Sequence, residues 1–242
     1  MKLKILLLAF CLMANYGSAQ KRWFKLYTDT AAEIGDAKAI TAKFVSDVRK
    51  ISPSTIMQVN TILKTSPYLI YYSDDSARTV NLPIWAEVIE PQKQFFYKVA
   101  GSEENGRQVF GLFFNGFYLP HELGHALAHT LQKETENWFK SLYEGEVFAN
   151  KIGILWWRKQ GRQKELAQCY AYAKKMFARL PNPVPAGQSV SAYFGKNYEQ
   201  ASRDPFVYGY MQFSQFINIY EDRTLPGFDV FVKQTIQQHS KK

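Results

Sequence analysis

The segment His121-Glu122-Leu123-Gly124-His125 constrains the fold more than any other feature of this 242-residue chain. Apolar residues at helical spacing predict a buried helix here, and they are Leu123, Ala126, Leu127 and Leu131. Residues four apart on a helix lie about 6 Å apart along its axis and about 40° apart around it. Both imidazoles can therefore bind one metal ion, while Glu122 flanks that ion as a base. A metal ion would also supply the partners that such buried polar groups need.

The third ligand of this site must come from elsewhere in the chain. His129 lies about 12 Å along the axis from His121, too far to share one ion. We therefore interpret His129 as a partly exposed helix residue. The longer pattern H-E-x-x-H-x-x-G-x-x-H is not completed, because Ala128 and Leu131 occupy the positions of its glycine and third histidine. We expect the third ligand to be a carboxylate on a following helix.

Two carboxylates in the next helical segment are candidates, Glu144 and Glu146. Asn150 follows Glu146 by one turn, where its amide can hydrogen-bond the free nitrogen of a ligand histidine. The small Ala149 beside it allows two helices to approach closely. Glu144 has Phe148 one turn later, and its charge suits the solvated start of a helix. We therefore predict His121, His125 and Glu146 as ligands of one zinc ion per chain, with water in the fourth position.

These residues resemble the gluzincin metallopeptidases. His-Glu-Leu-Gly-His, then twenty residues, then Glu146-x-x-Ala149-Asn150 is similar to the H-E-x-x-H plus E-x-x-A arrangement of that clan. The E-x-x-A-N form resembles ImmA/IrrE-type proteins, and E-x-x-A also occurs in aminopeptidase-N-like peptidases. The resemblance covers residues 121–150 and includes no G-A-M-E-N-like exopeptidase motif. It implies a zincin-like fold and zinc-dependent hydrolysis of peptide bonds.

The same resemblance implies roles for two further residues. Glu122 would accept a proton from a metal-activated water and pass it to the leaving amine. Zincins also use a tyrosine or histidine on a downstream helix to stabilise the oxyanion. Tyr208, sixty-two residues after Glu146 and off the apolar stripe of its helix, is the predicted donor. Tyr210, on that stripe, and His239, near the C-terminus, are the alternatives.

The first nineteen residues are typical of an export signal, with a basic start, an apolar core of about nine residues and small residues before Gln20. That core is too short to span a bilayer. We expect cleavage before Gln20 and a periplasmic or secreted protein. The bulky Phe10 argues against lipidation of Cys11. Cleavage would remove two lysines and lower the net charge from +9 to +7.

Residues 20–242 suffice for a single domain with a sizeable core. Cys169 would then be the sole cysteine, and its apolar helical surroundings favour a buried thiol. The basic residues lie in separate short clusters, which indicates a solvated face. We find no nucleic-acid motif, no later transmembrane stretch and no indication of an oligomeric state.

Periodicity predicts an α+β, zincin-like fold, in which a small mixed sheet precedes a helical bundle that carries the metal. A capping box, Thr30-x-x-Glu33, begins a helix over 30–50. Strands are expected at 68–72, 80–88, 95–99 and 108–114, with turns near 74–75 and 103–106. Pro83 marks its strand as an edge or bulged one. Helices are expected at 120–133, 135–159, 163–180, 200–221 and 227–238.

The expected function is that of an exported zinc metallopeptidase acting on a peptide or protein substrate. The run 108–113 could pair with that substrate as a strand beside the cleft, or be an ordinary core strand. A non-catalytic zincin that binds or senses is the alternative function, although Glu122 would then have no purpose as a base. A third class is a surface- or glycan-binding module, which would bind through the aromatic residues that make up 16% of the chain.

Overall fold

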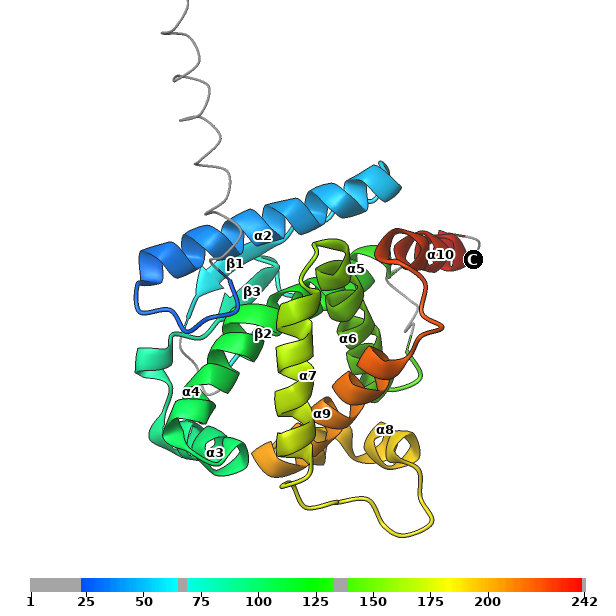
Figure 1. The fold of residues 1–242 in the computed structure, drawn as a ribbon. Helices are drawn as coiled ribbons and strands as arrows, with labels where there is room; N and C mark the ends of the chain where they lie inside the picture. The colour runs from blue at the N-terminus through cyan, green and yellow to red at the C-terminus, as the bar shows by residue number, and fades with distance from the viewer. Residues whose placement is uncertain (1–22, 65–68, 133–138, 241–242) are drawn as a thin grey trace, which may run out of the picture.

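The computed structural model describes residues 23–64, 69–132 and 139–240. Figure 1 shows a small sheet beneath the long helix α2 (Thr30–Ile51), with the remaining helices gathered beside and below it. The predicted α+β class with a small mixed sheet is therefore confirmed. The predicted export signal, residues 1–19, and Cys11 lie outside the described residues. Among the described residues, no helix combines the length and hydropathy needed to cross a membrane.

The sheet has three strands in the order β1-β3-β2. β1 (Asn60–Leu63) runs parallel to the central β3 (Thr79–Leu82), and β2 (Tyr71–Ser73) is antiparallel to it. β1 was not predicted, and β3 is much shorter than the predicted run 80–88. The edge-strand interpretation of that run is wrong, because β3 ends at Leu82, just before Pro83, and lies in the middle of the sheet.

α2 agrees with the predicted helix over 30–50, but its N-cap is not the predicted one. Asp29 precedes the helix, and its side chain accepts hydrogen bonds from the amides of Ala31 and Ala32. Glu33 is instead buried, at 2% exposure, against the helical core. The capping-box interpretation of Thr30 and Glu33 is therefore wrong.

Two predicted strands are helices. The run 95–99 belongs to α3 (Glu90–Ala100), and 108–114 spans α4 (Glu103–Leu112) and the start of a π-helical turn (Phe113–Phe117). Gly101, with φ of 93°, ends α3, and Ser102 caps α4 where a turn was expected at 103–106. Aromatic and β-branched residues favour strands, but here the caps and the burial of one face of each segment stabilise helices instead. The run 108–113 consequently cannot pair with a substrate as a strand.

The π-helical turn joins α4 directly to α5 (Tyr118–Leu131), the helix that carries the two predicted histidine ligands. Asn115 departs from helical angles within it, with φ of −99° and ψ of 24°. The N-terminal segment packs against this junction, since the amide of Phe24 donates to the Asn115 carbonyl. The indole of Trp23 also donates to the Gly116 carbonyl. The start of the helix that carries the two predicted ligands is therefore held by a segment about ninety residues earlier in the chain.

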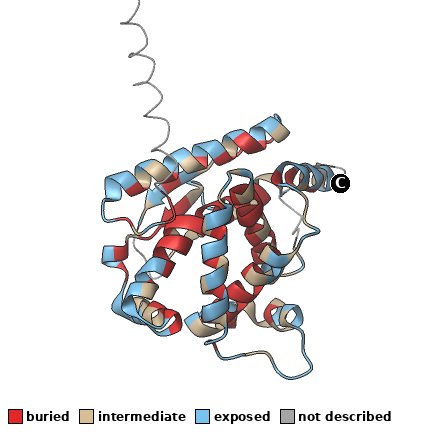
Figure 2. Cartoon of the chain, viewed as in Figure 1, coloured by how far each residue is buried: buried red, intermediate tan, exposed pale blue. Residues whose placement is uncertain are grey.

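The C-terminal half is helical, as predicted. Its helices are α6 (Leu142–Lys159), α7 (Gln163–Phe177), α8 (Val190–Ala201), α9 (Pro205–Glu221) and α10 (Phe228–Ser240). α8 was missed, and the predicted helix at 200–221 begins only at Pro205, after the Asp204 cap. Figure 2 shows that burial concentrates in α5 and α6, in the middle of the molecule. Cys169 is buried as expected, and burial raises its pKa.

Candidate metal centre

A glycine inside the motif brings α5 and α6 together. A Cβ at Gly124 would lie 3.0 Å from the Cα of Ala149 and 3.1 Å from the Cβ of Ile152. These contacts are tighter than ordinary Cβ packing, so a side chain at Gly124 would require α6 to move slightly away from α5. Ala149 is the small residue expected at this contact. The close approach carries Glu146 of α6 to the two histidines of α5.

Three ligand atoms from these helices converge. The Nε2 atoms of His121 and His125 are 3.2 Å apart. Glu146 places Oε2 3.3 Å from His121 Nε2 and Oε1 3.7 Å from His125 Nε2. Ligands about 2.0–2.2 Å from a tetrahedral ion are about 3.3–3.6 Å from one another. The three groups could therefore hold one metal ion.

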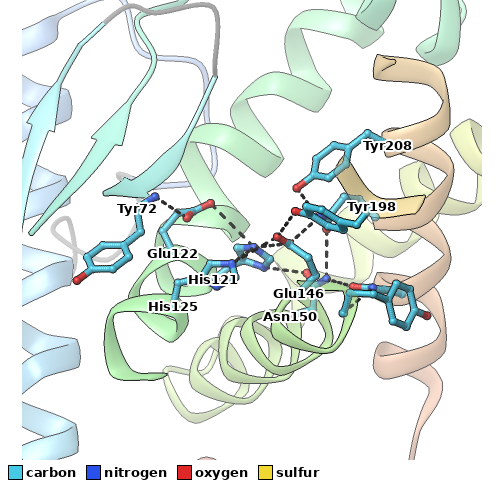
Figure 3. Close-up of polar contacts among 11 residues, drawn as sticks. Tyr72, His121, Glu122, His125, Glu146, Asn150, Tyr198 and Tyr208 are labelled. Carbon is cyan, nitrogen blue, oxygen red and sulfur yellow. Dashed lines mark hydrogen bonds and ion pairs between the residues drawn. The ribbon is translucent and has the colours of Figure 1, made fainter. Parts of the chain in front are cut away.

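Asn150 orients His121, as its position one turn after Glu146 suggested. His121 Nδ1 lies 3.0 Å from Asn150 Oδ1 (Figure 3). The Asn150 amide nitrogen donates to Gln212 Oε1 at 3.2 Å and to Gln215 Oε1 at 2.8 Å, so Oδ1 is the acceptor for the imidazole. The proton of His121 is thereby placed on Nδ1, and the lone pair of Nε2 faces the site.

Glu146 is held by two donors that the sequence did not reveal as site residues. The Tyr198 hydroxyl donates to Glu146 Oε1 at 2.7 Å, and the Gln212 amide donates to Oε2 at 2.7 Å. Tyr198 reaches the site from α8, which departs from helical angles at Asn197. Phe194 and Tyr198, four residues apart after the Ser189 cap, were the available signal for α8. Gln212 could have been noticed as an amide within an apolar helical stripe.

The predicted oxyanion donor, Tyr208, lies one hydrogen bond further from Glu146. Its hydroxyl accepts from the Gln212 amide at 2.9 Å and is hydrogen-bonded to Tyr198. Tyr210 is 8% exposed, and its ring packs on Phe177 with centroids 4.6 Å apart. Burial, and then the charge of Glu146, raise the pKa of both Tyr198 and Tyr208, so their hydroxyls stay protonated.

The other candidates raised by the sequence lie at different places. Glu144 is exposed, and its carboxylate accepts from the Lys140 amide beside the start of α6. His239 is in the last turn of α10, three residues from the C-terminus. His129 is outside the triad, as its distance along α5 predicted, and its Nδ1 lies 2.8 Å from the hydroxyl of Tyr72.

Glu122 approaches the triad from the side of the sheet. Its Oε2 accepts the backbone amide of Tyr72 in β2 at 2.8 Å. Its Oε1 faces the triad and lies 3.9 Å from His121 Nε2. Figure 3 shows Glu122 between Tyr72 and the imidazoles, opposite the tyrosines of α8 and α9. Burial raises the pKa of Glu122 to about 7, and the charge of His121 and the Tyr72 amide offset this effect only in part.

The protonation of the triad follows from its burial and mutual contacts. Burial lowers the pKa of His125 to about 4, so its imidazole is neutral at pH 7. Burial alone would raise the pKa of Glu146, but the hydrogen bond with His121 and the nearby imidazoles lower it to about 2. Burial alone would lower the pKa of His121, whereas Glu146 and Glu122 raise it. A divalent cation binding here would displace the second proton of His121, on Nε2, and leave the one on Nδ1 that faces Asn150.

A cleft of about 850 Å³ opens onto the triad between α6 and α8. His125, Glu146 and Tyr198 form part of its wall. The mouth combines the apolar side chains of Phe139 and Leu142 with polar groups of α8. The candidate site is therefore connected to an opening large enough for part of a polymeric substrate.

Comparison with protein-family models, with curated proteins and with solved structures gave no match to this chain. The functional assignment must therefore rest on the site's own geometry and chemistry.

Proposed function

We propose that this protein is a zinc-dependent metallopeptidase of the gluzincin type, exported and acting on peptide bonds. The observation that carries the proposal is the convergence of His121, His125 and Glu146 beside a fourth buried group, Glu122, that is not needed as a ligand. Two imidazoles and one carboxylate form a donor set typical of catalytic zinc, with one coordination position left open. The cleft at His125 and Glu146 gives a substrate access to that position.

In this proposal the metal, when bound, activates a water molecule and polarises the scissile carbonyl. Glu122 takes a proton from the water through Oε1 and later delivers it to the leaving amine. Burial raises the pKa of Glu122 in the metal-free site, and the charge of a bound cation would favour the carboxylate form that accepts the proton. Asn150 holds the His121 ring with Nε2 toward the site.

The oxyanion donor is proposed from the pair of tyrosines. Tyr208 is the residue favoured by the sequence, and its hydroxyl belongs to the network around Glu146. Tyr198 competes with it, because Tyr198 touches Glu146 directly and forms part of the cleft wall. We favour Tyr198 as the donor, with Tyr208 hydrogen-bonded behind it.

The test combines metal analysis with a cleavage assay. We expect purified protein to bind one equivalent of zinc and to cleave members of a peptide library until a chelator is added. Glu122→Gln should retain zinc and fold while turnover falls by about 10²–10⁴-fold, because only proton transfer is lost. Glu144→Gln, an exposed glutamate near the same cleft, is the matched control and should remain active.

Each failure has a distinct meaning. Protein that binds no metal would contradict the whole proposal and favour a surface-binding module. Protein that binds zinc and cleaves no peptide would instead favour the non-catalytic zincin. Loss of zinc in Glu122→Gln would show that Glu122 is a ligand and that the assigned base is wrong.

A further inference from the structure

The third histidine of α5 has a partner that links it to the site. His129 is half-buried, and its Nδ1 lies 2.8 Å from the hydroxyl of Tyr72, with the two rings 6.0 Å apart. Tyr72 is the central residue of β2, an edge strand of the sheet. The proposed hydrolysis uses neither residue in binding metal or transferring protons.

Tyr72 is attached to α5 twice. Its backbone amide donates to Glu122 Oε2, and its hydroxyl is hydrogen-bonded to His129. Glu122 and His129 are seven residues apart, which places them about 10 Å apart along the axis and on nearly the same face of the helix. Two attachments at that separation restrict both the sliding and the tilting of β2 against α5.

The strand geometry explains why the amide of Tyr72 is available. In an antiparallel pair, successive residues point their amides alternately toward and away from the partner strand. Tyr72 donates to Glu122, so its amide points away from β3 and toward α5. The position of this amide therefore depends on where β2 lies on the helix, and the contact between the Tyr72 hydroxyl and His129 fixes β2 there together with its pairing to β3.

Because of this attachment, the two oxygens of Glu122 have different partners. Oε2 is held by the amide, and Oε1 is turned toward the Nε2 of His121. A carboxylate base must present one oxygen to the attacking water in a narrow range of positions. We propose that Tyr72 and His129 are positioning residues, which fix strand β2 on α5 so that Glu122 presents Oε1 to the reaction. This inference rests on the proposed peptidase function.

The first test measures the Tyr72 amide itself and needs no activity. Hydrogen exchange by NMR on the full chain, with and without zinc, reports whether that amide stays bonded to Glu122. We expect His129→Phe and Tyr72→Phe to speed its exchange by about tenfold, the effect of weakening one hydrogen bond. His129→Asn keeps a hydrogen-bonding atom near the position of Nδ1 and should restore protection. Unchanged exchange in both Phe variants would overturn the proposal.

The second test separates positioning from substrate binding. In Tyr72→Phe and His129→Phe we expect kcat to fall by about tenfold while KM and zinc stoichiometry stay as in the wild type. The double variant should lose no more than either single one, because both remove the same contact. Tyr172→Phe removes a comparable hydroxyl contact, with Gln108, away from the site and is the matched control.

The outcomes of the two tests distinguish this inference from the proposed function. An active wild type with unchanged kcat in the variants would overturn the positioning role alone. A wild type that binds zinc and cleaves nothing would overturn the peptidase and the positioning role with it, whatever the exchange rates show. A kcat that falls in His129→Phe and returns in His129→Asn, with a normal Tyr172→Phe, would support positioning.

Discussion

Two buried carboxylates on helices, Asp47 of α2 and Glu146 of α6, differ in the charge of the groups that contact them. Asp47 accepts hydrogen bonds from the Lys43 ammonium at 2.6 Å, the Gln160 amide at 3.0 Å and the Trp156 indole at 3.2 Å. Burial alone would raise the pKa of Asp47, but Lys43 and the other donors lower it. The charge of this carboxylate is therefore balanced within the fold, and Asp47 joins α2 to α6.

Among the described residues, Glu146 has no lysine or arginine partner, and its positive charge comes from His121, whose pKa it raises. Its carboxylate contacts the imidazoles of His121 and His125, and it accepts hydrogen bonds from the neutral Tyr198 and Gln212. A second carboxylate, Glu122, lies nearby and raises the local negative charge further. A buried carboxylate without a fixed positive partner is unfavourable. Asp47 is therefore balanced by groups of the fold itself, whereas the group around Glu146 could take a cation from solution.

The largest expected effect is the loss of bound metal when a ligand residue is replaced. We expect His121→Ala and Glu146→Gln to lose the bound metal while the protein stays folded, since the hydrophobic core does not depend on either. Glu144→Gln should bind metal as the wild type does. Metal analysis after dialysis, with circular dichroism for the fold, measures both. Equal metal loss in Glu144→Gln and Glu146→Gln would show that the wrong carboxylate was chosen.

The next largest effect concerns the two tyrosines near Glu146. We expect Tyr198→Phe to lower kcat by about 10²–10³-fold, as removal of an oxyanion donor does, with little change in stability. Tyr208→Phe should have a smaller effect, because its hydroxyl lies behind that of Tyr198. Steady-state kinetics on one peptide compares them. A larger loss of kcat in Tyr208→Phe would show that Tyr208, the residue predicted from the sequence, is the oxyanion donor.

A third prediction concerns Glu33, a carboxyl of α2 that lacks the cation Asp47 has. Burial raises its pKa from 4.5 to about 7, and the hydrogen bond from Asn115 offsets this only in part. The folded state thus holds a proton that the unfolded state loses, so this stabilisation is complete below pH 4.5 and is lost as the pH rises through 7. The shift corresponds to about 3 kcal/mol.

Glu33→Gln should remove the part of that pH dependence that Glu33 contributes, leaving that of Glu122, and make the protein more stable than the wild type at pH 8. Urea unfolding at several pH values between 4 and 8 measures it, and Glu104→Gln, at an exposed position, is the control. A wild-type stability that rises between pH 5 and 7, with no change in slope in Glu33→Gln, would contradict the prediction.

The smallest effect is expected at Asp47. Asp47→Asn keeps an acceptor for Trp156 but loses the charge that binds Lys43, whose side chain is half exposed. We expect a loss of about 1–2 kcal/mol in unfolding free energy and no change in metal content. Loss of metal with unchanged stability would contradict the comparison, because it would show that Asp47 contributes to metal binding and not to the stability of the fold.

The candidate triad was predictable because its geometry is largely local. Helical periodicity alone places His121 and His125 on one face, and Asn150 one turn after Glu146 identifies the carboxylate with a supporting hydrogen bond. The structure brings these four side chains together. The roles in catalysis stay predictions until metal and activity are measured.

Strands were predicted at 95–99 and 108–114, but both runs lie in helices between residues 90 and 117. Phenylalanines and valines are common in strands, so the composition of these runs favoured the wrong element. The decisive signals were the Glu90-Pro91 start and the cap at Ser102, each of which favours helix. α8 escaped notice because its only fully buried apolar residue is Phe194, which leaves a weak helical stripe.

By itself, the sequence determined the helix of the motif, the two histidines that share its face and the carboxylate with a polar neighbour one turn away. These depend on contacts within one or two turns, which local periodicity encodes. Only the tertiary structure decided that Tyr72 of an edge strand would hold Glu122, and that Tyr198 and Gln212 would hold Glu146. Those partners lie fifty or more residues apart in sequence, and they meet only because packing of whole helices and a sheet brings them together.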